Sequence, residues 1–285
     1  MSFDFFSKIG TSHTICQDYS LSGRKGSEDD GIEYAIVSDG CSGKPSEVPG
    51  YPFTDYGSRF LVRAAEMNMP THPDYRDRFP IVKVVTEAKA MARVAYLPPE
   101  SIDATMILAI RDKDVLRIFR YGDGVVAIKF KDGHIWHQSI KYNDNKPLYP
   151  SYLTSERRFS EAVKEIQTMY MITGSIGSPS NIPSTWELFS GTEQYQKVQH
   201  PEIWNKWGDV DTVLIFSDGV ESFHQRGRQI PLEDVLEQIF SFKSYAGRFL
   251  TRRCRRFFDK FCVENGWKNI DDFSVAGLHN DGCNP

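Results

Sequence analysis

Two aspartate-glycine pairs, each directly after an apolar run, are the residues of this sequence best suited to chemistry. Asp39-Gly40 ends the stretch YAIVSDG, and Asp218-Gly219 ends the stretch TVLIFSDG. A buried strand fixes the carboxylate at its end, and the glycine lets the backbone turn so that a carbonyl oxygen can face the same point. Oxygen donors of this kind bind hard cations such as Mg²⁺ and Mn²⁺. The two pairs therefore predict one metal site built from both halves of the chain.

Further acidic residues lie near both ends of the chain. Asp18 is found in CQDYS, and Asp271-Asp272 directly precede the apolar stretch FSVAGL. A single Asp-Gly is more often a turn than a metal ligand, because both residues are common in turns. Two copies after apolar runs, accompanied by these acids, favour the metal site.

The sequence lacks the motifs of several other kinds of enzyme site. No cysteine is followed six residues later by arginine, as a cysteine-dependent phosphatase requires, and no Gly-x-Ser-x-Gly surrounds Ser42. Ser38 stands where a phosphate-binding loop of nucleotide enzymes needs glycine. The stretch DVDTVL at 209–214 precedes its strand, whereas the motif of aspartyl-phosphate enzymes follows one. The cluster RRCRR at 252–256 is on the polar side of an expected helix, which favours a solvated face over a nucleic-acid site and leaves docking of an acidic partner open.

Composition narrows the class of protein. The chain has 285 residues, 40% of them hydrophobic, and a formal net charge of -4, so it can bury a large core and has no overall attraction to nucleic acid or to an anionic membrane. No apolar run reaches the length of a membrane helix, and the first residues do not resemble a signal peptide. The five cysteines form no C-x-x-C pair, which indicates free thiols rather than a zinc site. We expect a single cytoplasmic domain with no nucleic-acid or membrane partner.

The sequence predicts that hairpin strands and amphipathic helices position these acids. Runs rich in Val, Ile and Phe, several separated by tight turns, predict strands at 34–38, 105–110, 115–121, 125–130, 134–140, 212–217 and 273–278. Helices are expected at 54–68, 81–96, 231–243 and 246–265, the last stopped by Gly266. Residues 141–210 show no clear period and predict a mobile surface insertion around a short helix near 160–167. The alternation favours an α+β fold with two antiparallel sheets sandwiched between helices.

The order of the motifs resembles that of metal-dependent serine/threonine phosphatases of the protein phosphatase 2C type, in their bacterial branch. The matching stretches are GTSHTICQDYS (10–20), AIVSDGCSG (35–43), DATMILAI (103–110), FRYGDGVVAI (119–128), VLIFSDGVES (213–222) and DDFSVAGL (271–278). The resemblance implies a four-layer α-β-β-α sandwich with two Mn²⁺ or Mg²⁺ ions between the sheets. It also implies hydrolysis of phosphoserine and phosphothreonine in a protein substrate, by water activated between the ions.

The same resemblance implies roles for individual residues. Asp39 is expected to bridge both ions, with the carbonyl of Gly40 beside it. Asp218 and Asp271 are expected to bind the first ion. Asp271 is preferred to Asp272 because the family motif Asp-Asn-x-Thr aligns with Asp271-Asp272-Phe273-Ser274.

Two more aspartates complete the expected set. Asp18 would hold the second ion through water, and Asp123, in YGDG, matches a position that can support a third ion. Because all these acids are present, the resemblance favours an active enzyme, with Asp39, Asp218 and Asp271 as its catalytic residues.

Three departures from the family pattern bear on activity. His13 stands where the family carries an arginine that binds the substrate phosphate, and a neutral imidazole is a weaker anion clamp than guanidinium. Cys41 takes a position that relatives fill with His or Met, and we assign it no catalytic role. Residues 141–210 lack the usual Leu-Thr-x-Ala-Leu-Gly stretch. The interpretations left open are therefore a monomeric phosphatase, an inactive member of the fold that acts as a regulatory binding protein, and an interaction module of a larger signalling or defence system.

Overall fold

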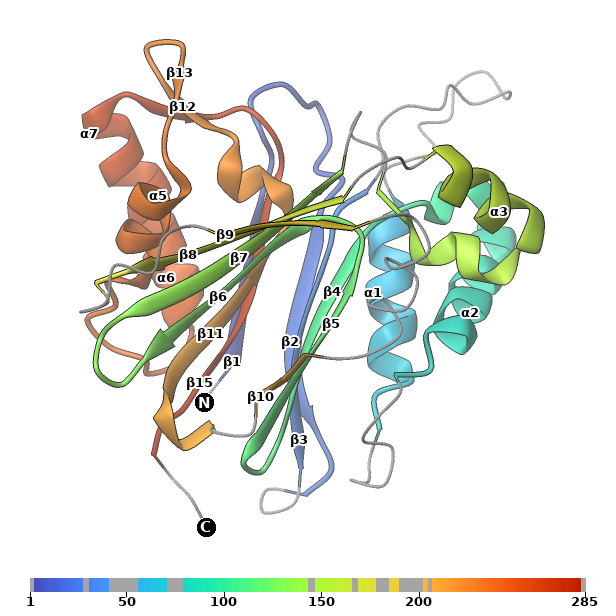
Figure 1. Cartoon of the computed structure of the whole chain (residues 1–285), viewed down its shortest axis with the longest axis horizontal. Helices are drawn as coiled ribbons and strands as arrows, with labels where there is room; N and C mark the ends of the chain where they lie inside the picture. The colour runs from blue at the N-terminus through green and yellow to red at the C-terminus, as the bar shows by residue number, and fades with distance from the viewer. Residues whose placement is uncertain are drawn as a thin grey trace.

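The computed structural model describes residues 3–27, 31–40, 56–70, 79–142, 147–165, 169–177, 185–189, 202–204 and 207–282. Two antiparallel sheets pack face to face, and helices cover the outer face of each (Figure 1). The predicted four-layer sandwich and its α+β class are confirmed.

The larger sheet has seven strands, and every neighbouring pair is antiparallel. Its strands, in spatial order, are β1 (Phe3–Lys8), β15 (Phe273–His279), β11 (Val210–Phe216), β6 (Gly124–Phe130), β7 (Ile135–Tyr142), β8 (Met169–Ile176) and β9 (Thr185–Phe189). The first and last strands of the chain therefore lie side by side at one edge.

The smaller sheet has five strands, also antiparallel throughout. In spatial order they are β10 (Glu202–Trp204), β5 (Val115–Tyr121), β4 (Met106–Asp112), β3 (Ile32–Ser38) and β2 (Tyr19–Lys25). Every residue of β3 is buried. Its side chains alternate between the facing sheet and the helices, which explains why most of this strand is apolar; the buried Glu33 is paired with Arg24 and Arg111.

Helices cover both outer faces, as Figure 1 shows. On the five-stranded sheet lie α1 (Gly57–Met67) and α2 (Ile81–Val94), with η3 (Pro99–Ile102), η5 (Pro150–Thr154) and α3 (Glu156–Glu165) beside them. On the seven-stranded sheet lie α5 (Leu232–Phe240) and a continuous run of α6 (Phe249–Arg256), a π-helical segment η8 (Phe257–Cys262) and α7 (Val263–Asn265). Gly266 ends this run in the left-handed conformation, with φ at 66°, as the sequence predicts.

Short elements complete the chain. They are η6 (Trp207–Asp209), η7 (Asp218–Glu221) and a small sheet of β13 (Arg228–Gln229), β12 (Phe223–Gln225) and β14 (Trp267–Asn269). Among the residues described, no helix is long and apolar enough to cross a membrane. Three cysteines in this part of the chain, Cys16, Cys254 and Cys262, are free thiols.

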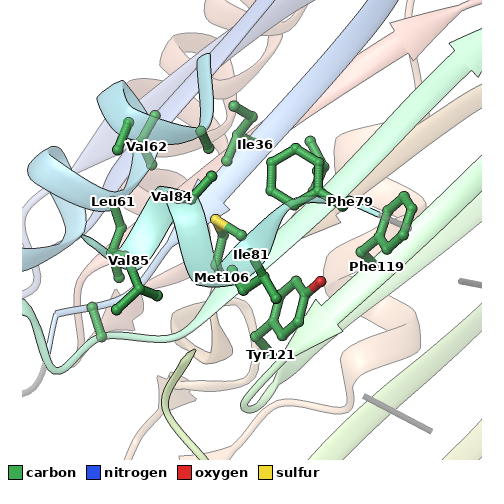
Figure 2. Close-up of a cluster of buried hydrophobic side chains, with 14 of the residues drawn as sticks. Ile36, Leu61, Val62, Phe79, Ile81, Val84, Val85, Met106, Phe119 and Tyr121 are labelled. Carbon is green, nitrogen blue, oxygen red and sulfur yellow. The ribbon is translucent and has the colours of Figure 1, made fainter. Parts of the chain in front are cut away.

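Three buried clusters hold the layers together. Figure 2 shows the first, in which Leu61 and Val62 of α1 and Val84 and Val85 of α2 face Ile36 of β3. A second, rich in phenylalanine, joins the seven-stranded sheet to α5, α6 and η8. The third lies between the sheets. Burial of this apolar area is the main contribution that stabilises the fold.

The region 141–210 contains more regular structure than its sequence predicts, including the strands β9 and β10. The expected short helix is present as α3, but Met169–Ile176 is β8, which pairs with β7 along eight residues of the main sheet. A mobile surface insertion is therefore wrong for this segment. The polar side chains of Thr173 and Ser175 interrupt its apolar pattern, so the strand was missed.

Candidate metal centre

All the sequence-predicted site residues except Asp18 line one pocket, although they come from distant parts of the chain. The pocket has a volume of about 130 Å³. Its lining residues are His13, Gln17, Asp39, Gly40, Thr105, Asp123, Pro147, Tyr149, Asp218 and Asp271. Strand ends account for the convergence, because Asp39 follows β3, Asp218 follows β11 and Asp123 lies between β5 and β6. Four carboxylates thus share one small space.

Backbone and side-chain hydrogen bonds fix Asp39 at the end of β3. The amide of Thr105 donates to the carbonyl of Asp39 at 2.8 Å, and the amide of Asp39 donates to Thr105 Oγ1 at 3.2 Å. Gly40 forms a bridge with Ala104. A Cβ on Gly40 would lie 2.7 Å from the carbonyl oxygen of Gln17, so glycine here allows the loop carrying Gln17 to approach closely.

The second Asp-Gly pair uses its glycine in the same way. The amide of Ser217 donates to the carbonyl of Ser274 at 3.1 Å, which holds the end of β11 against β15. A Cβ on Gly219 would collide with the carbonyl oxygen of Asp272. In both pairs, glycine allows backbone segments to meet directly behind the carboxylate.

Gly219→Ala is expected to lower the free energy of unfolding by about 1–3 kcal/mol, because the added methyl group must displace the backbone at Asp272. Urea denaturation measures the change. Gly208→Ala is the matched control, since its Cβ would meet no atom within 4 Å. Equal stability of the two variants would contradict the close approach described here.

Asp18 lies behind the pocket and is 2% exposed. Neither of its carboxylate oxygens has a hydrogen-bond partner among the described residues. Burial raises the pKa of Asp18 to about 8. Buried carboxylates without partners are costly, and a bound cation removes that cost.

The pocket aspartates also repel one another. Burial, followed by the charges of Asp18 and Asp218, raises the pKa of Asp39 well above its ordinary value. Burial and the charge of Asp218 do the same for Asp123. Burial and the charge of Asp271 raise the pKa of Asp218 to about 6. The acids therefore form one electrostatic group whose negative charges raise one another's pKa.

The two adjacent aspartates before β15 have different environments. Asp272 is buried, and it accepts hydrogen bonds from the amides of Gly10 at 2.8 Å and Gln17 at 2.6 Å. Asp271 lines the pocket, and its side chain is 44% exposed. Asp272 thus fastens the N-terminal loop, whereas Asp271 is the one of the two that can reach a pocket ligand.

His13 lies between these two carboxylates. Its Nδ1 is 3.0 Å from Asp272 Oδ2, and its Nε2 is 3.5 Å from Asp271 Oδ1. Burial lowers the pKa of His13, but its hydrogen bond to Asp272 and the surrounding negative charges outweigh this and raise the pKa. The imidazole therefore holds its proton to a higher pH than an ordinary histidine, which the sequence did not predict. Cys41 lies outside the described residues.

The donor chemistry of the pocket fits hard divalent cations. Its described lining residues include four aspartates and no lysine or arginine. Asp18 adds two buried oxygens without partners. In the side-chain positions described, no group of three or more His, Cys, Asp or Glu residues is arranged to hold a metal ion. A divalent cation suits this pocket because its positive charge would neutralise the repulsion between the carboxylates.

Four lining residues were not singled out from the sequence. Thr105 and Gln17 lie inside the matching stretches DATMILAI and GTSHTICQDYS, so their positions gave a signal. Pro147 and Tyr149 come from the region without periodicity and gave none. They reach the pocket because the neighbouring η5 and α3 are held by Asp103, which accepts hydrogen bonds from Ser151 Oγ and Arg158 Nη2, both at 2.6 Å.

Comparison with known proteins identifies the family. Residues 9–250 match the protein family described as "Protein phosphatase 2C", and the chain therefore belongs to this family. A comparison with curated protein sequences finds no match.

Solved structures show the same fold. A bacterial serine phosphatase matches with 11% identity and a TM-score of 0.53, covering 100% of both chains. The serine/threonine phosphatase PstP/Ppp of Mycobacterium tuberculosis matches with 14% identity and a TM-score of 0.50, covering 97% of both chains. The S. agalactiae serine/threonine phosphatase matches with 12% identity and a TM-score of 0.50, covering 97% of this chain and 98% of the other.

Proposed function

We propose that this chain is a metal-dependent phosphatase of phosphoserine and phosphothreonine in proteins, with two Mn²⁺ or Mg²⁺ ions in the aspartate pocket. One observation carries the proposal: the pocket holds four carboxylates and no lysine or arginine among its described lining residues. A phosphate group is an anion, so it would be repelled from this pocket unless cations bind there first.

The ligand assignment follows the predicted roles. Asp39 would bridge both ions and Gly40 would offer its carbonyl, while Asp218 and Asp271 would complete the first ion's ligands. Asp18 would support the second ion through water, and Asp123 a third. Bound divalent ions would lower the pKa of a water molecule and stabilise the negative charge of the phosphoryl group.

Residues of the chain itself prepare the pocket. Thr105 holds the backbone of Asp39 through two hydrogen bonds, so the shared carboxylate needs little reorganisation on binding. Asp272 ties down the loop with His13 and Gln17. His13 supplies positive charge at the pocket wall, close to Asp271, where it can attract a phosphate oxygen.

The alternative is an inactive member of the fold that acts as a regulatory binding protein. The position of His13 favours the inactive binding protein. Its imidazole faces two carboxylates at the position where the family's arginine binds phosphate. If those contacts persist when a ligand enters, His13 contributes little to phosphate binding. The shared aspartate set favours the phosphatase.

Purified protein should hydrolyse para-nitrophenyl phosphate and phosphothreonine peptides with Mn²⁺ or Mg²⁺ and not with EDTA, because the pocket needs cations to admit phosphate. A phosphotyrosine peptide serves as the specificity control. Absence of turnover with either metal, from protein whose circular dichroism shows it to be folded, would reject the phosphatase and support the binding protein.

A further inference from the structure

A second cavity, of about 770 Å³, lies on the other side of the N-terminal loop from the aspartate pocket. We name it the β1 groove. It runs between β1, the start of β2, Arg59 of α1 and the first two turns of α6. Its size is suited to several residues of an extended peptide.

The β1 groove carries positive charge on its rim. The charged side chains are those of Lys8, Arg59, Arg248 and Arg255. None of the four forms an ion pair with a carboxylate in the described part of the chain. Lys8 lies over the ring of Phe258, and Arg59 lies over the rings of Tyr19 and Tyr56. Four cations without a carboxylate partner in the described residues contrast with the formal net charge of -4 for the whole chain.

The acidic residues of the groove do not cancel this charge at its surface. Asp4 is 7% exposed, and its carboxylate accepts hydrogen bonds from the amides of Phe5 and Thr251 and from the hydroxyl of Thr251. Asp18 also lines the groove, but it is 2% exposed, so its carboxylate presents almost no surface to a ligand. A ligand in the groove would therefore meet cations and apolar side chains.

Exposed apolar side chains line the same groove. Phe5, Ile9 and Ile15 are 38%, 40% and 41% exposed. The edge strand β1 is partly protected, because the carbonyl of Phe5 accepts a hydrogen bond from Thr251 Oγ1. Binding would thus rely on side-chain contacts and charge rather than on addition of a strand.

One loop forms a wall of both cavities. His13 and Gln17 face the aspartate pocket, whereas Thr14, Ile15 and Cys16 face the β1 groove. A peptide that inserts a phosphorylated side chain into the pocket can therefore lay its neighbouring residues along the groove.

The arginines of α6 do not all contribute. Arg252 donates to the carbonyls of Ala246 and Ser244, and Arg253 donates to the carbonyl of Gln238, so both fasten the helix. Arg255 lines the groove, and Arg256 is exposed elsewhere on the helix. The cluster therefore divides into two arginines that fasten the helix, Arg255 in the groove and Arg256 exposed outside it.

We propose that the β1 groove binds an acidic, extended segment of the phosphoprotein substrate, next to its phosphorylated residue. The proposal rests on the proposed phosphatase function. Charge complementarity identifies the occupant as acidic, and the exposed aliphatic side chains of Ile9 and Ile15 favour a peptide with apolar side chains.

The test compares Arg255→Glu with Arg256→Glu, which changes the charge equally at a neighbouring position outside the groove. For each variant, kcat/KM is measured for a phosphothreonine peptide flanked by Glu and Leu, and for para-nitrophenyl phosphate as the internal reference. Arg255→Glu should lower the peptide-to-ester ratio about 3- to 10-fold, because attraction becomes repulsion. Arg256→Glu should leave this ratio within a factor of about two, and 0.5 M NaCl should reduce the difference. Equal ratios in the two variants would overturn the proposal.

A binding measurement separates this proposal from the proposed function. Fluorescence anisotropy of a labelled acidic peptide without phosphate does not need turnover. Weaker binding by Arg255→Glu than by Arg256→Glu supports the groove even if the ester is not hydrolysed, in which case only the phosphatase function fails. Tighter binding of a single-stranded oligonucleotide than of the peptide would overturn the acidic-peptide assignment.

Discussion

Asp39→Asn is expected to lower kcat/KM for a phosphothreonine peptide by roughly 10³-fold, because it removes the carboxylate that both metal ions would share. The same change should raise the melting temperature of the metal-free protein at pH 8, since it removes an acid whose charged form is disfavoured by burial and by the charges of Asp18 and Asp218. A gain of about 1 kcal/mol corresponds to roughly 2–4 °C in a chain of this size. Steady-state kinetics and thermal unfolding in EDTA measure the two effects.

The opposite signs of these effects make the test specific. If Asp39 had only a structural role, its change to asparagine would lower the stability and the activity of the protein together. Asp259→Asn, at an exposed position of η8, is the control and should leave both quantities unchanged. Normal turnover by Asp39→Asn would reject the metal-bridging role, and a lower melting temperature would reject the electrostatic account of the pocket.

The fold was largely readable because its strands and helices carry strong periodic patterns. The buried strands β3, β4, β5, β6 and β11 are short, apolar and separated by turn residues, and both faces of β3 are covered. The sequence of the long C-terminal helix has a clear apolar face, and a glycine marks its end. In contrast, β1, β2 and β8 mix polar and apolar residues, because each has a face or an edge in contact with less buried surroundings. Pattern alone cannot distinguish such strands from loops.

The sequence predicted the acidic residues of the candidate site but not the arrangement of the residues around them. The positions of Asp39 and Asp218 after apolar strands gave a direct physical signal, and Asp18 and Asp271-Asp272 were recognised as further acids near the chain ends. The family resemblance supplied Asp123 and the individual roles. Sequence spacing gave no indication that His13 would lie between Asp271 and Asp272, because that arrangement depends on how the N-terminal loop folds against β15. The raised pKa of His13 is a consequence of this tertiary contact.

The pocket aspartates also make the stability of the protein depend on pH and on metal. Burial holds the pKa of Asp218 at about 6 and that of Asp18 at about 8, above the ordinary value of 3.8. Between pH 4 and pH 8 the folded chain therefore binds more protons at these groups than the unfolded chain, so their contribution to stability is lost as the pH rises. In EDTA, Asp18→Asn should reduce the fall in melting temperature between pH 5.5 and pH 8.

Mn²⁺ or Mg²⁺ should reverse this loss, because metal ligands must be deprotonated and the cation replaces the protons. The melting temperature should rise with metal, and the rise should be larger at pH 8 than at pH 5.5. At a concentration 100 times its dissociation constant, a single ion stabilises the folded state by about 2.7 kcal/mol. Differential scanning calorimetry at constant ionic strength, with KCl as the control salt, measures the shift. An equal shift at both pH values would mean that the ions bind to surface carboxylates, which are already ionised at pH 5.5, whereas the buried aspartates titrate between the two pH values.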